Sequence, residues 1–78
     1  MPENIVGDQI RRLRSRQDMS QEMLAARLGR VGWDISRGTL AKIEAGIRCV
    51  SDKELLLLAK GLRVTVETLF EGEGKGRR

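Results

Sequence analysis

The chain has 78 residues, 40% of them hydrophobic, which is enough for one compact domain and too few for a second core. It contains no histidine and a single cysteine, Cys49, which excludes histidine-based acid–base catalysis, the usual zinc sites and an internal disulfide. No other nucleophile–base pair stands out. We therefore expect no enzyme, no cofactor and no metal site.

The charge and the apolar pattern indicate the kind of partner. The net charge is +4 and the pI is near 10.0, which favours an anionic partner such as nucleic acid. No stretch approaches the ~20 apolar residues of a membrane span, and the first residues lack the pattern of a secretory signal. A lone Cys49, expected to be a half-buried apolar residue, suits a reducing compartment. The sequence predicts a cytoplasmic protein without membrane contact.

The first of five predicted helices runs from about residue 5 to residue 17. Val6, Ile10 and Leu13 follow helical spacing and form one apolar stripe. Asp18 interrupts this pattern, and Met19 is expected to fold back over the next helix.

The second predicted helix begins after Ser20, whose hydroxyl can accept a hydrogen bond from a free backbone amide. Leu24 and Leu28 form its buried stripe. Gly29 is one candidate for its end, because glycine tolerates the left-handed conformation. The alternative end lies one turn further, at about Gly32.

The third predicted helix opens at Ser36 and closes at Gly46, with three apolar side chains pointing inward. These are Ile35, Leu40 and Ile43. The second and third helices, joined by a short connection in a basic chain, are typical of a helix-turn-helix whose second helix enters the major groove of DNA.

The fourth predicted helix has the clearest start, because Ser51 and Glu54 match a capping box. It runs to about Leu62, and its expected buried residues are Leu55, Leu58, Ala59 and Leu62. A fifth helix follows from Thr65 to about Glu71, anchored by Val64, Leu69 and Phe70.

The fold class is therefore all-α, with a domain over residues 1–71. Residues 72–78 alternate glycine with charge and are expected to form a flexible basic tail, because such a segment cannot bury apolar surface. The tail is either solvated or in contact with phosphate.

These motifs resemble the Cro/CI-type (lambda-repressor-like, XRE) family of helix-turn-helix domains over about residues 5–70. The resemblance rests on residues 20–25, on residues 36–40 and 43–46, and on residues 58–59 followed by 64–70. It implies a compact five-helix lambda-repressor-like domain that binds double-stranded DNA at a palindromic operator. The implied function is that of a transcriptional regulator, in the first place a repressor, of bacterial or phage type and found on the nucleoid when bound.

The resemblance also implies residue roles. Gln21, at the start of the second helix, would bind a backbone phosphate. The base-facing residues of the third helix would be Ser36, Arg37, Gly38 and Thr39, with Lys42 one turn later. Arg48 lies where the family's loop amides approach phosphate. Arg14 and Glu44 match a family ion pair that joins the first helix to the recognition helix.

The sequence departs from the family pattern at two places, and both affect the residue roles that the resemblance implies. The connection is longer than usual, because residues 30–34 precede Ile35. Trp33 within it either packs over the motif as a lid or projects as a contact residue. Gly38 stands where a side chain often reads bases. Either the backbone approaches DNA closely there, or the first helical turn simply tolerates glycine.

The run of four leucines at residues 55–58 cannot be buried on one face of a helix. At about 100° per residue, Leu56 lies on one flank and Leu57 nearly opposite the core. Because the family that the chain resembles commonly dimerises through this C-terminal half, the resemblance implies that these residues and Val66 form a homodimer interface. Such a dimer would place two recognition helices about 34 Å apart. The alternative is that Leu57 is merely exposed or binds a different protein.

A second hypothesis for the function belongs to another class. An antitoxin or co-regulator uses the same fold mainly to bind a protein partner, and the fold does not decide between the two. Selective binding to a short palindromic duplex favours the regulator, whereas stable association with a second polypeptide favours the interaction module.

Overall fold

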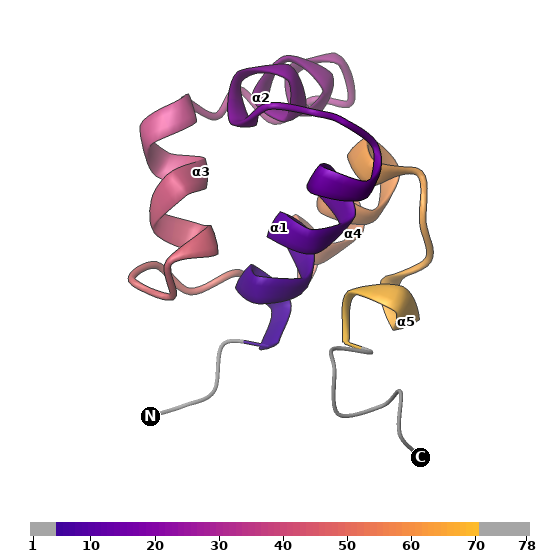
Figure 1. Cartoon of the computed structure of the whole chain (residues 1–78). Helices are drawn as coiled ribbons and strands as arrows, with labels where there is room; N and C mark the ends of the chain where they lie inside the picture. Colours follow the sequence, from indigo (N-terminus) through magenta and orange to yellow (C-terminus); the bar gives the residue numbers. More distant parts are fainter. Residues whose placement is uncertain (1–4, 71–78) are drawn as a thin grey trace.

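The computed structural model describes residues 5–70, and this part of the chain forms five α-helices (Figure 1). Their bounds are Ile5–Arg16 (α1), Gln21–Arg30 (α2), Arg37–Glu44 (α3), Asp52–Leu62 (α4) and Val66–Leu69 (α5). The all-α prediction is confirmed. The expected tail lies outside the described residues. Among the described helices, none has the length and apolar character needed to cross a membrane.

Four helices begin at a side-chain cap, in the places that the sequence predicts. The capping hydroxyls, each accepting from the amide three residues on, belong to Ser20, Ser36, Ser51 and Thr65. At α4 the Glu54 carboxylate also accepts from the Ser51 amide, which completes the capping box. Each cap satisfies an amide that has no partner inside its helix.

The helix ends follow the sequence less closely. α2 passes through Gly29 and ends at Arg30, between the two expected ends, and the glycine with positive φ after it is Gly32 (φ +105°). Gly46 (φ 83°) follows α3 as expected. α4 ends before Arg63, a non-glycine residue with φ of 59°, which the sequence does not signal. α5 ends at Leu69, two residues earlier than expected.

Apolar side chains from all five helices and from the connections around α2 form one core. Its buried members are Ile10, Leu13, Met19, Leu24, Leu28, Ile35, Leu40, Ile43, Leu58, Ala59, Leu62 and Leu69. The expectation that Met19 folds back is thus correct. Leu55 and Val64 are half-buried at the rim of the core. The expectation that Phe70 anchors α5 is wrong, because Phe70 is 49% exposed at the end of a helix of only four residues.

A close approach of α2 to α4 sets the buried face of α4. A Cβ atom on Gly61 would lie 2.7 Å from Leu28 Cδ2, so the two helices meet where Gly61 has no side chain. At about 100° per residue, burial of Gly61 turns the core-facing side of α4 toward Leu57 and away from Leu56. Leu56 is accordingly 56% exposed while Leu57 is half-buried, and the expectation that Leu57 lies farthest from the core is wrong.

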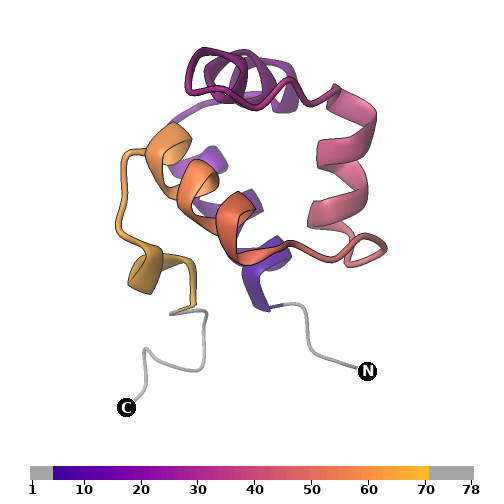
Figure 2. The ribbon, with the colours of Figure 1, turned by 180° about the vertical axis from the view of Figure 1, so that it is seen from behind.

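The two ends of α2 contact different helices. α2 packs on α3 and α4, α1 packs on α3 and α5, and α4 packs on α5. In Figures 1 and 2, α2 crosses the top of the molecule, with α3 on one side and the end of α4 toward the other. The N-terminus of α2 therefore meets α3, and its C-terminus meets the end of α4.

Candidate nucleic-acid interface

A buried ion pair fixes α3 to α1. Arg14 Nε donates to Glu44 Oε2 at 2.8 Å and its Nη2 donates to Glu44 Oε1 at 2.9 Å. The two side chains are 15% and 5% exposed, respectively. Arg14 Nη1 also donates to the Met19 carbonyl at 2.9 Å, so one guanidinium joins α1, the connection after it, and α3. The parallel pair of bonds fixes orientation as well as distance.

Gln21 extends this connection to the first residue of α3. Its Nε2 donates to Glu44 Oε1 at 3.0 Å, and its Oε1 accepts from Arg37 Nη1 at 3.3 Å. Only this orientation of the amide gives a donor to the carboxylate and an acceptor to the guanidinium. Gln21 thus links the buried Glu44 to the exposed Arg37, and the start of α2 is held against the start of α3.

A wide, open hollow of about 500 Å³ lies at this junction. Its lining residues are Arg14, Ser20, Gln21, Glu22 and Arg37. The guanidinium of Arg37, the amide of Gln21 and the positive end of the α2 dipole are groups that a phosphate oxygen can accept from. The carboxylate of Glu22 at the same place repels anions. The hollow therefore suits the single negative charge of one backbone phosphate better than a multiply charged anion.

The exposed side of α3 presents few free side chains. Ser36 Oγ accepts from the Thr39 amide at 3.1 Å and donates to Thr39 Oγ1 at 3.0 Å, so the Ser36 hydroxyl is engaged in the cap, whereas Thr39 uses its hydroxyl there only as an acceptor. A Cβ on Gly38 would meet only Ser36 Oγ, at 3.9 Å, so packing does not require glycine there. Arg37 and Lys42 are exposed and carry the positive charge of this helix.

Arg48 is placed differently from the other residues expected at the interface. Its guanidinium makes two hydrogen bonds to Glu54, at 3.1 and 3.0 Å, and lies 5.9 Å from the centre of the Trp33 ring. The bond to Glu54 raises the pKa of Arg48, and the same bond lowers the pKa of Glu54. The side chain of Arg48 therefore links the connection between α2 and α3, through Trp33, with α4, through Glu54. Only the backbone near Arg48 remains to approach phosphate.

Trp33 packs as a lid in the longer connection. It is half-buried against the core, and its amide donates to the Leu28 carbonyl at 2.9 Å. The same connection brings Ile35 into the core, so α3 starts in a fixed place despite the extra residues. Sequence reasoning missed the contact between Trp33 and Arg48, since 15 residues separate them and no motif relates them.

The arginines of α1 are only partly compensated within the helix, because Arg11 and Arg12 share the single carboxylate of Asp8. Arg16 is exposed. One further expectation changes. Cys49 is exposed rather than half-buried, since it lies in the connection between α3 and α4, which runs over the surface.

In this five-helix domain a short connection joins α2 to α3, and side-chain hydrogen bonds hold the two helices together. This arrangement is a helix-turn-helix. The helix-turn-helix family model matches residues 10–69, so the chain belongs to the Cro/CI-type helix-turn-helix family of DNA-binding regulators. Searches of curated proteins and of solved structures found no match.

Proposed function

We propose that this protein is a sequence-specific regulator of transcription that inserts the first turns of α3 into the major groove of an operator. The observation that carries the proposal is the link from Arg14 through Glu44 and Gln21 to Arg37. It holds the recognition helix at its last residue, Glu44, and at its first, Arg37, while the side chains of Arg37 and Lys42 remain exposed. A helix held in this way can present side chains to base edges without first becoming ordered.

Different residues have different tasks in this proposal. Arg37 reads a base, since an arginine fork paired with guanine is the commonest specific contact in the major groove. Gln21 and the backbone beside Arg48 bind phosphates and so set the position of the domain on the duplex. Bound in the promoter, such a domain acts as a repressor, and its concentration or a partner controls it.

Selection from random duplexes at a stated salt concentration tests this function. Arg37→Ala should cost about 1–3 kcal/mol of binding free energy and relax the preference at one base position, whereas Gln21→Ala should weaken all sequences alike. Arg16→Ala, which removes an exposed arginine from α1, is the control for lost charge. Identical base preferences for wild type and Arg37→Ala would refute the assignment of Arg37. Affinity that does not change with salt would refute DNA binding.

A further inference from the structure

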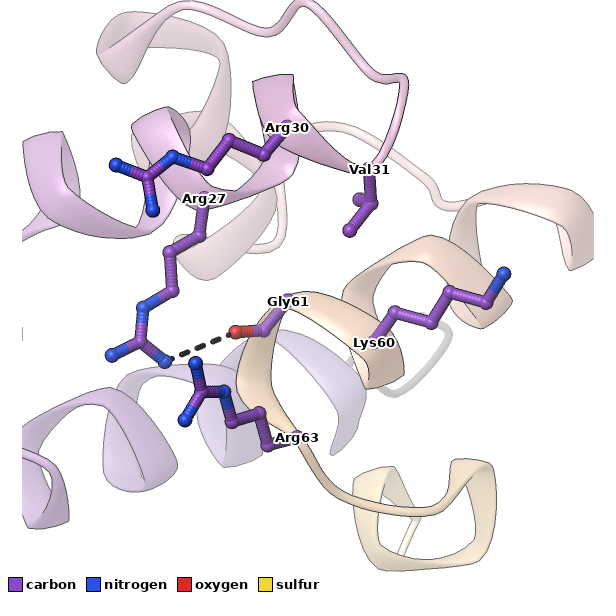
Figure 3. A pocket seen from close by; sticks show the side chains of 6 residues that line it. All are labelled: Arg27, Arg30, Val31, Lys60, Gly61 and Arg63. Carbon is purple, nitrogen blue, oxygen red and sulfur yellow. Dashed lines mark hydrogen bonds between the residues drawn. The ribbon is translucent and has the colours of Figure 1, made fainter.

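A second cluster of positive charge lies at the end of α2 remote from α3. Arg27 and Arg30 of α2 and Lys60 and Arg63 at the end of α4 line a pocket of about 120 Å³. Its other lining residues are Val31 and Gly61. In Figure 3 the three arginine side chains extend to one side of the pocket and Lys60 extends to the other. These four cations are called the rear basic patch below.

The cations of the rear basic patch are not paired with carboxylates in the described part of the chain. The chain has 15 basic and 11 acidic side chains, and four of the basic ones line this pocket. Within residues 5–70, the ion pairs engage other arginines, namely Arg11, Arg12, Arg14 and Arg48. Among the residues that the structure describes, no acidic side chain lines the pocket.

The patch is separate from the recognition surface. α2 has 10 residues, which corresponds to about 15 Å of helix between Gln21 at one end and the patch at the other. Arg27 is partly occupied, because its Nη1 donates to the Gly61 carbonyl at 3.4 Å and to Gln17 Oε1 at 3.5 Å. Arg30 and Arg63 are exposed, and their guanidinium groups are available to an anion.

The composition of the patch indicates nucleic acid rather than protein as the occupant. Protein interfaces have an apolar and often aromatic centre, but the only apolar side chain lining this pocket is Val31, which is half-buried. Interfaces with nucleic acid are more polar and strongly positive. Because α2 and α4 present their C-termini here, the helix dipoles do not attract phosphate, and the flexible side chains must make the contacts. Such a surface binds phosphates without reading bases.

We propose that the rear basic patch binds the phosphate backbone of a second duplex DNA segment while α3 occupies the operator. This inference rests on the proposed function, because it needs a first duplex on the recognition helix. The domain then holds two DNA segments on opposite ends of α2, one by sequence and one by charge. The second contact depends strongly on salt and is indifferent to sequence.

Capture of a second duplex by the full chain tests the proposal. An operator duplex from the selection above is immobilised and saturated with protein, and a labelled duplex of unrelated sequence is added. The test variant carries Arg30→Gln and Arg63→Gln. The control carries Arg11→Gln and Lys53→Gln, which removes the same charge from exposed sites on α1 and the start of α4. Urea unfolding verifies that both double variants are folded.

Wild type and control should capture the labelled duplex, and the test variant should lose capture while keeping operator affinity and preference. Loss of two phosphate contacts should make the slope of log affinity against log salt less steep by about 1.8. The affinity for the second duplex should then fall about tenfold less between 50 and 200 mM salt. Equal capture by the test variant and wild type would overturn the proposal. So would a wild type that binds the operator and poly-glutamate but no second duplex, which would assign the patch to an acidic protein. A wild type that selects no operator refutes the proposed function instead.

Discussion

Arg14 on α1 and Glu44 on α3 meet through two parallel hydrogen bonds of 2.8 and 2.9 Å, although 30 residues separate them in the chain. The Glu44 side chain is 5% exposed, so its charge depends on Arg14 and on the Gln21 amide for compensation. Buried ion pairs add little net stability, because removing two charges from water costs about as much as their attraction returns. The pair therefore serves mainly to orient the recognition helix.

Removing one partner of this pair should nevertheless be costly. Arg14→Ala leaves Glu44 buried without its counter-charge, and we expect the free energy of unfolding to fall by about 3–5 kcal/mol. Arg11→Ala breaks an exposed pair with Asp8 and should cost less than about 1 kcal/mol. Urea denaturation of both variants measures the difference. If Arg14→Ala costs no more than Arg11→Ala, the pair does not hold α3 in place.

The contact between α2 and α4 depends on the missing side chain of Gly61. Gly61→Ala would bring a methyl group to 2.7 Å from Leu28 Cδ2, and Leu28 is fully buried, so the core must shift. We expect a loss of about 1–3 kcal/mol in unfolding free energy. Gly29→Ala is the control, because its methyl group would meet nothing within 4 Å, and it should stabilise α2 by up to about 1 kcal/mol. Similar stabilities for the two variants would contradict the close approach.

The pKa of Glu54 predicts a defined pH dependence. The hydrogen bond from Arg48, followed by that from the Ser51 amide, lowers this pKa from its ordinary value near 4.5. Ionised Glu54 therefore favours the folded state above the unfolded pKa, and this contribution disappears as the pH falls through the lower folded pKa. Acidification should thus reduce the unfolding free energy of wild type more than that of Glu54→Gln.

Glu54→Gln is a clean probe because glutamine also fills this position of a capping box. The unfolding free energies of both proteins, followed from neutral pH to below the lowered pKa of folded Glu54, should converge at the acidic end. Glu67→Gln, on the exposed side of α5, is the control for a lost carboxylate and should follow wild type. Parallel curves for wild type and Glu54→Gln would show that the link to Arg48 contributes nothing.

The parts of the fold that sequence predicts are those with local causes. The caps at Ser36 and Ser51 and the inward position of Ile43 depend on neighbours within one or two turns. The rotation of α4 could not be predicted in this way, because it follows from Gly61 meeting Leu28, 33 residues away. Local periodicity contains no information on which side of a helix a neighbour approaches.

The same limit applies to the interface. The resemblance to the family relates Arg14 to Glu44, and the structure contains that ion pair. Nothing in the spacing indicated that Arg48 joins Glu54, or that Arg30 and Arg63 share a pocket. These arrangements arise where connections and helix ends meet in space. Counting arginines along the chain therefore did not show which of them carry unpaired charge.

The exposed surface of α4 supports a revised form of the proposed dimer. Leu56 is 56% exposed, Leu57 and Val66 are half-buried, and all three belong to the C-terminal half of the fold. A palindromic operator is matched by two-fold protein symmetry, with recognition helices about 34 Å apart. Since Leu56 offers more apolar surface than Leu57, it is the better position for a test.

We expect sedimentation at rising concentration to show a dimer, which a palindromic duplex strengthens because each half-site binds one α3. Leu56→Lys should shift the protein toward monomer, since association would bury a charge. Ile47→Lys is the matched control, because Ile47 is 75% exposed but belongs to the connection after α3 and not to α4. A strict monomer that binds one copy per site would refute the dimer. If Leu56→Lys associates as strongly as Ile47→Lys, the dimer forms through another surface.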